Sequence, residues 1–101
     1  MKFIKHLAVV ALSLLFCFSA FADKLKVGFV YIGPVGDHGW TYMHEQGRLA
    51  VKKEFGDKVE TTFVENVKYG PQAETVIRAM AKNGMDIIFA TSFGYMEPML
   101  K

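Results

Sequence analysis

Residues 33–40, Gly-Pro-Val-Gly-Asp-His-Gly-Trp, carry the side chains best suited to chemistry in this chain. The glycines and the proline predict a shaped turn, because glycine adopts positive φ and lets the backbone approach a ligand closely. Asp37 and His38 can form hydrogen bonds beside the backbone of Gly39. Trp40 carries a flat ring that can stack on a planar ligand. A structural interpretation is also open, in which Asp37 caps the next helix, His38 faces solvent and Trp40 packs in the core.

This turn joins a strand to a helix in the predicted secondary structure. Residues 25–31 are rich in β-branched and aromatic side chains, which is typical of a strand. Residues 40–55 have apolar side chains at helical spacing, and Gly56-Asp57 ends the predicted helix. The positions that share one face of this helix are Trp40, Met43, Gly47, Ala50 and Val51.

The rest of the chain repeats the alternation of strand and helix. Residues 59–64 alternate enough to form a second strand, and residues 71–82 form the clearest helix, which opens with a proline and stops at an Asn-Gly pair. Residues 85–90 are an almost continuous apolar run, as expected of a strand buried on both faces of a parallel sheet. A loop at residues 91–94 and the opening of a third helix at residues 95–101 follow. The apolar stripe of the clearest helix comprises Ala73, Val76, Ile77, Met80 and Ala81.

The order of these elements predicts the fold class. A β-α-β-α-β-α run with right-handed crossovers gives an α/β fold with a parallel sheet in strand order 2-1-3. Ligands of such sheets bind beyond the carboxyl ends of the strands. We therefore expect the site in the loops after Tyr31, Val64 and Ala90, which emerge at the same edge.

Residues 1–22 have the pattern of a secretory signal peptide. Two lysines precede an uninterrupted apolar run, and small residues at positions 20 and 22 predict cleavage before Asp23. The run is shorter than the roughly 20 residues that span a bilayer, which argues against a membrane anchor. Phe16 stands before Cys17, where a lipoprotein signal has a small residue, so no lipid anchor is expected. The sequence therefore predicts export to the periplasm.

The composition of the exported part excludes some classes of protein. Cys17 is the single cysteine, so residues 23–101 have no disulfide framework and need an ordinary core. The formal net charge is +2, but two lysines leave with the signal peptide, and acidic and basic residues then balance. No nucleic-acid partner is expected, because that requires a basic patch. Since residues 23–101 are few for a sheet covered on both faces, we expect the chain to be the beginning of a larger protein.

Motifs for catalysis and cofactors are missing from the sequence. The glycines from position 33 run G-x-x-G-x-x-G, which does not match the dinucleotide motif G-x-G-x-x-G, and there is no Walker lysine motif. No cluster of further ligands accompanies His38 and His44, so no metal is expected. Asp37 and His38 are adjacent and cannot orient each other as a catalytic triad requires, although Ser92 is a candidate nucleophile nearby. We expect no cofactor and no enzyme.

Two segments resemble a known family. The first is Lys-Val-Gly-Phe-Val-Tyr-Ile-Gly-Pro-Val-Gly-Asp-His-Gly-Trp at residues 26–40, and the second is Ala-Thr-Ser-Phe-Gly-Tyr-Met-Glu-Pro at residues 90–98. Together they are similar to the basic membrane protein family, the PnrA-like, purine-nucleoside-receptor-type solute-binding proteins of ABC importers. The resemblance implies a type I periplasmic-binding-protein fold with two α/β lobes that close on a ligand. Residues 23–101 would then be the N-terminal part of the first lobe, and the partners would be a small-molecule ligand and an inner-membrane permease.

The resemblance also implies which residues meet the ligand. In that family the loop after the first strand places an aromatic ring against the base and polar groups at its edge, which correspond here to Trp40 and to Asp37 and His38. The loop after the third strand contributes Ser92, Phe93 and Gly94, where a second aromatic ring and backbone amides at a helix start could reach the ligand. For Phe93, packing in the core is the alternative.

The chain departs from the nucleoside-receptor pattern at two positions. Gly39 and Thr41 stand where that pattern has serine and asparagine, which puts ribose recognition in doubt but leaves base stacking intact. The expected ligand is therefore a purine nucleoside or a free purine base. A periplasmic module that senses a ligand for a membrane receptor is the main alternative to an importer component, and a periplasmic enzyme is a weaker one.

Overall fold

The structure is a computed structural model that describes residues 23–101. The predicted signal peptide, its cleavage site and the expectation about Cys17 fall on residues outside this range. The helices and strands are β1 (Leu25–Val30), α2 (Trp40–Phe55), β2 (Val59–Val64), α3 (Pro71–Lys82), β3 (Ile87–Ala90) and α4 (Met96–Leu100), with short 3-10 turns at Gly56–Lys58 and Phe93–Tyr95. Each predicted helix and strand is confirmed, with its ends shifted by no more than two residues. No helix within the described part of the chain is both long enough and apolar enough to cross a membrane.

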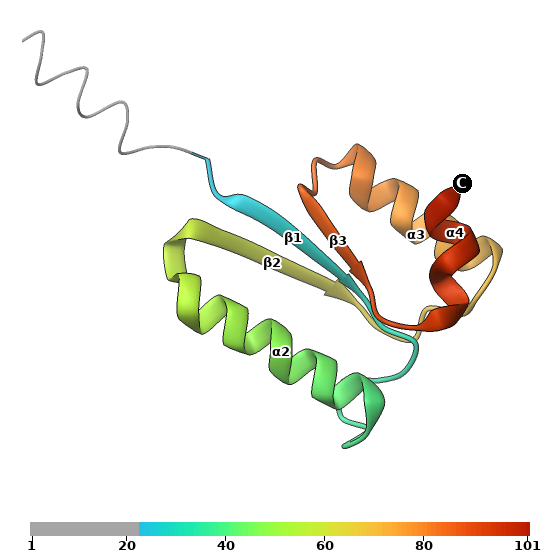
Figure 1. Cartoon of the computed structure of the whole chain (residues 1–101), viewed down its shortest axis with the longest axis horizontal. Coiled ribbons are helices and arrows are strands. Elements are labelled where there is room, and N and C mark those ends of the chain that lie inside the picture. Colours follow the sequence, from blue (N-terminus) through green and yellow to red (C-terminus); the bar gives the residue numbers. More distant parts are fainter. Residues whose placement is uncertain (1–22) are drawn as a thin grey trace, which may run out of the picture.

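The three strands form one parallel sheet in the order β2-β1-β3 (Figure 1), so the predicted α/β fold and strand order are confirmed. The register places Val30, the last residue of β1, opposite Val64 of β2 and Ala90 of β3. All three strands therefore end at the same edge, and the loops that follow them emerge side by side (Figure 1).

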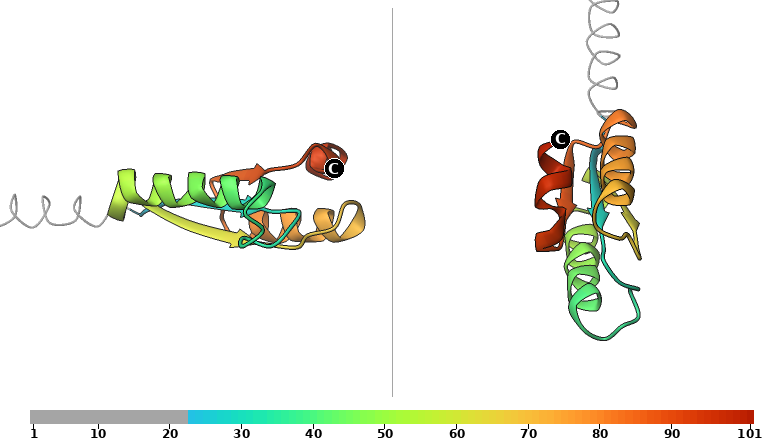
Figure 2. Two further views of the ribbon diagram at one scale, coloured as in Figure 1. Left: turned by 90° about the horizontal axis from the view of Figure 1, so that it is seen from below. Right: turned by 90° about the vertical axis from the view of Figure 1, so that its right-hand side faces the viewer.

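Helices α2 and α3 cover opposite faces of the sheet (Figure 2). Side chains alternate between the two faces of a strand, so successive residues of β1 belong to different cores. Val27, Phe29 and Tyr31 form the cluster on one face, whereas Val30 belongs to a second cluster with α3. Gly28 also faces α3, because a Cβ there would lie 2.8 Å from the sulfur of Met80.

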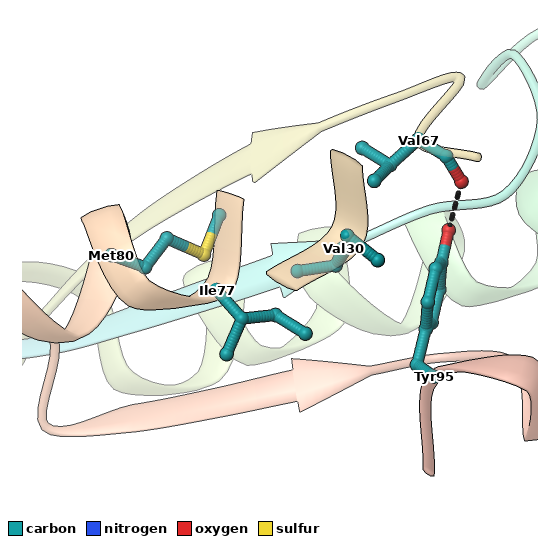
Figure 3. Packing of buried hydrophobic residues seen from close by; sticks show 6 residues of the cluster. Val30, Val67, Ile77, Met80 and Tyr95 are labelled. Carbon is teal, nitrogen blue, oxygen red and sulfur yellow. Dashed lines mark hydrogen bonds between the residues drawn. The ribbon is translucent and has the colours of Figure 1, made fainter. Parts of the chain in front are cut away.

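The core beneath α3 follows the predicted apolar stripe except at Ala81, which is exposed. Ala73, Ile77 and Met80 are buried against Val30. Figure 3 shows Ile77, Met80 and Val30 of this group. The hydroxyl of Tyr95 donates a 2.6 Å hydrogen bond to the backbone oxygen of Val67, which joins the loop after β2 to the chain beyond β3 (Figure 3). Burial of Tyr95 raises the pKa of its hydroxyl to about 12, so this donor keeps its proton at neutral pH.

The buried face of α2 differs from the apolar spacing of its sequence. Its buried residues are Thr41, Glu45 and Arg48, whereas Trp40 and Met43 are 60% and 64% exposed. These three polar residues also recur at helical spacing, at positions i, i+4 and i+7. The helix therefore packs on the sheet through a polar stripe, and the interpretation of Trp40 as a core residue is wrong.

A hydrogen-bonded ion pair explains how charged residues can be buried between α2 and the sheet. Glu45 accepts a 2.9 Å hydrogen bond from the hydroxyl of Tyr31 and pairs with Arg48. Arg48 also donates to the hydroxyl of Thr61, 2.8 Å away, and its guanidinium carbon lies 4.7 Å from the ring centroid of Phe63. The polar atoms of the stripe are thus satisfied by the segment after β1, by β2 and by one another, as buried charges require.

The prediction that the third strand is buried on both faces is wrong for β3. Ile88 and Ala90 pack against the cluster beneath α3, but Ile87 and Phe89 on the other face are 41% and 48% exposed. Helix α2 packs on β2, and this face of β3 stays open within residues 23–101 (Figure 1). The apolar run at residues 85–90 therefore predicted the strand, but it did not predict how much of the strand is covered by other elements.

Candidate functional site

The three loops at the carboxyl ends of the strands are bonded to one another, as the topology predicted. The amide of Val67, after β2, donates to the oxygen of Tyr31, after β1, over 2.9 Å. The amide and the hydroxyl of Thr91, after β3, both donate to the oxygen of Val30, over 3.1 and 2.8 Å. The side chain of Glu65 accepts from the amide of Val35 over 2.8 Å. This edge of the sheet is thus one connected surface rather than three separate loops.

The carboxylate of Asp37 organises the start of α2. One oxygen accepts hydrogen bonds from the amides of Gly39 and Tyr42, at 2.9 and 2.8 Å, and the other accepts from the amide of Thr41 at 3.2 Å. These bonds, first among them the one from Gly39, lower the pKa of the Asp37 carboxyl. The capping role expected for Asp37 is therefore confirmed, and contact with a ligand stays a prediction.

His38 presents its ring at the outer rim of the same turn. Its φ of 54° lies in the left-handed region, where histidine is enriched among residues other than glycine but still carries strain. The ring lies against Tyr42, with 4.9 Å between the two ring centroids. His38 is exposed, so its ring remains accessible to a ligand or to solvent.

The indole of Trp40 is exposed, yet its edge is held in place. Its Nε1 donates a 2.7 Å hydrogen bond to the backbone oxygen of Thr91, which ties the first turn of α2 to the loop after β3. The ring of His44, one helical turn later, lies 4.9 Å away at an interplanar angle of 44°. A large aromatic ring that is 60% exposed and anchored at its polar edge is preorganised for stacking.

Ser92, Phe93 and Gly94 lie at the end of β3 and are organised by Tyr69, which sequence reasoning missed. The hydroxyls of Tyr69 and Ser92 are hydrogen-bonded, and the rings of Tyr69 and Phe93 lie 5.9 Å apart. Phe93 is 87% exposed, so the alternative that it packs in the core does not hold within the described residues. Tyr69 follows β2 in a loop that the topology had already placed at this edge, and that position was the available signal.

Gly94 leaves room for the ring of Tyr69. A Cβ at Gly94 would overlap that ring, whereas a Cβ at Gly36 would meet nothing within 4 Å. We expect Gly94→Ala to lower the free energy of unfolding by about 1–3 kcal/mol, because Tyr69 would have to move and lose its bond to Ser92. Gly36→Ala is the matched control and should change the melting temperature little. Equal melting temperatures for both variants and the wild type would show that the Tyr69 ring adapts freely.

An open cavity of about 550 Å³ lies along the outer edge of β3. This volume is within the range of about 300–1,000 Å³ that is typical of small-molecule sites. Its lining residues come from α2, β3 and the segment after β3 and are His44, Ile88, Phe89, Ala90, Thr91, Ser92, Phe93, Tyr95, Met96 and Met99. Two predicted site residues, Ser92 and Phe93, therefore share the cavity with His44, which sequence reasoning had considered only as a metal ligand.

The residues of the first turn connect to this cavity indirectly. Trp40 reaches it through its hydrogen bond to Thr91 and its contact with His44. No group of three His, Cys, Asp or Glu side chains among residues 23–101 is arranged to hold a metal ion. The arrangement brings aromatic rings and hydroxyl groups together at this edge of the sheet.

Comparison with known proteins agrees with this fold. The family model for PnrA-like ABC transporter substrate-binding proteins matches residues 24–101. A purine-binding protein of Brucella abortus is 58% identical over 79 residues, which are 78% of this chain and 23% of that protein. A Haloferax volcanii protein whose name describes an ABC transporter glucose-binding protein is 38% identical over 77 residues, or 76% of this chain and 19% of that protein.

A solved structure shows the same fold. The solute-binding protein of an ABC transporter system from Conexibacter woesei superposes with a TM-score of 0.68 at 22% identity, over 75% of this chain and 24% of that protein. The chain thus spans about a fifth to a quarter of the length of the proteins that it matches. Because the family model covers nearly the whole described part, the chain belongs to the PnrA-like family of ABC transporter substrate-binding proteins.

Proposed function

We propose that this chain forms the N-terminal part of the first lobe of a periplasmic substrate-binding protein, which delivers a purine to the permease of an ABC importer. The family consists of substrate-binding proteins rather than enzymes, and this favours capture without turnover. It also favours a transporter component over a sensing module. Export through a signal peptide cleaved before Asp23 is part of the same proposal.

The observation that carries the purine assignment is the anchored and exposed indole of Trp40. Its bond to Thr91 fixes the ring, and stacking on a purine would use the exposed surface. Phe93, which is 87% exposed, offers a second ring in the loop after β3. The similarity to a purine-binding protein of Brucella abortus supports the same ligand class.

The surroundings of Thr41 favour a free base over a nucleoside. Thr41 is fully buried, and its hydroxyl accepts a 3.0 Å hydrogen bond from the amide of Gly33. It stands where the nucleoside-receptor pattern has an asparagine, so that position offers no polar group to a ribose. The neighbouring Gly39 has no side chain to replace the serine of the pattern.

Calorimetric titration of the full-length protein tests this function. We expect saturable binding of adenine or hypoxanthine, weaker binding of adenosine and guanosine, and recovery of the ligand without chemical change. Glucose serves as the comparison sugar, because one relative is named for it. Binding of glucose without any purine, or conversion of the purine into a product, would contradict the proposal.

A further inference from the structure

His44 lies between the anchored indole and the cavity. It is on α2, one turn after Trp40, so both side chains project from the same side of the helix. Its ring contacts that of Trp40 on one side and lines the cavity together with Thr91, Ser92 and Phe93. The ring is partly buried, so a ligand in this part of the cavity would meet it.

One hydrogen bond determines which nitrogen of His44 carries the proton. Its Nδ1 lies 2.9 Å from the backbone oxygen of Trp40. A carbonyl oxygen can only accept, so Nδ1 must be the donor. In the neutral ring Nε2 then has no proton and is a hydrogen-bond acceptor.

The neighbouring carboxylates are bonded to other groups and not to the His44 ring. Glu45 is bonded to Tyr31 and Arg48 on the face of α2 that packs on the sheet. Asp37 accepts its hydrogen bonds from the amides at the start of α2. Among residues 23–101, the His44 ring is hydrogen-bonded through Nδ1.

We propose that His44 is a specificity-determining residue whose Nε2 accepts a hydrogen bond from an N–H group of the bound purine base. This inference rests on the proposed function, because it takes a purine as the ligand. A purine base carries N–H groups on its rim, and a glycosidic bond removes the one on its five-membered ring. An acceptor at Nε2 that meets this N–H of the five-membered ring would favour free bases, in agreement with the environment of Thr41.

Three substitutions separate this role from packing and from support of Trp40. Glutamine places its amide oxygen at the ε position and can replace Nε2, whereas asparagine places its amide at the δ position and can replace only Nδ1. Phenylalanine keeps a ring against Trp40 and removes both nitrogens. The probe is adenine, titrated calorimetrically into the full-length protein, and the melting temperature of each variant is measured alongside.

We expect His44→Gln to keep the affinity for adenine within about three-fold of the wild type. His44→Asn and His44→Phe should each weaken it by about ten-fold, the loss that corresponds to one buried hydrogen bond. If His44→Phe binds adenine as tightly as the wild type, His44 contributes only packing and the inference is overturned. If the Asn variant keeps the affinity for adenine and the Gln variant loses it, the inference is overturned. Such a result would mean that His44 acts through its Nδ1 bond to Trp40 and not through Nε2. A wild-type protein that binds none of the purines would overturn the proposed ligand and this inference together.

Discussion

Replacing Trp40 by leucine in the full-length protein should weaken purine binding by about ten- to a hundred-fold. Stacking of a base on an aromatic side chain is worth roughly 1–3 kcal/mol, and leucine has no π face to supply it. The indole is available for this contact because it is 60% exposed and held by its bond to Thr91. Isothermal titration with adenine, hypoxanthine, adenosine and guanosine measures the effect.

Trp40→Phe is the matched control for this experiment. Phenylalanine and leucine both lose the hydrogen bond from Nε1 to Thr91, so the difference between the two variants isolates the aromatic face. The Phe variant should therefore retain more affinity than the Leu variant. Equal affinities for the wild type and both variants, measured on folded protein, would remove Trp40 from the site. Trp40 is the single tryptophan of this chain, so its fluorescence should also respond when a purine stacks on it.

Glu45→Ala should lower the free energy of unfolding by about 3–5 kcal/mol, because it leaves the charge of Arg48 buried without its partner. The two side chains of this ion pair are each only 10% exposed. The hydrogen bond from Arg48 also lowers the pKa of the Glu45 carboxyl. The stability that the pair supplies is therefore present above the ordinary carboxyl pKa and is lost as the pH falls through the lowered one. Denaturant unfolding of the full-length protein at neutral pH measures the change.

A double variant distinguishes a broken pair from a general loss of packing. Glu45→Leu with Arg48→Met removes both charges and keeps apolar volume beneath α2, so its cost should be far smaller than the sum of the two single substitutions. Additive costs would show that the pair is not coupled. Because α2 carries Trp40 and His44, the single variants should also weaken purine binding if the helix shifts on the sheet.

Local signals in the sequence were sufficient for the elements and their order. Pro71 opens α3, and Gly56 and Gly84 have φ of 53° and 85° where α2 and α3 have ended, conformations that glycine adopts readily. The strand order followed from the handedness of crossovers, which is a general property of parallel sheets. The position of the site followed as well, because parallel strands end at a common edge.

The interior of the site depended on partners that are distant in sequence. Tyr69 organises Ser92, and the contact between them spans two loops. The proton position on His44 depends on a carbonyl group whose direction is known only once the helix has formed. Neither relation appears in a periodic pattern, since periodicity describes one element at a time.

The buried face of a helix could be predicted from the sequence for α3 but not for α2. The apolar stripe of α3 was readable in the sequence, because apolar side chains there meet an apolar sheet. The buried stripe of α2 was not readable, because Glu45 and Arg48 can be buried only with partners across the helix-sheet interface. These partners are Tyr31, Thr61 and Phe63. The sequence by itself determined the secondary structure, the topology and the family resemblance, which depend on local propensities and contiguous motifs. Only the tertiary structure decided which face of α2 is buried and that Trp40 is exposed, because pairing of buried charges outweighed apolar spacing.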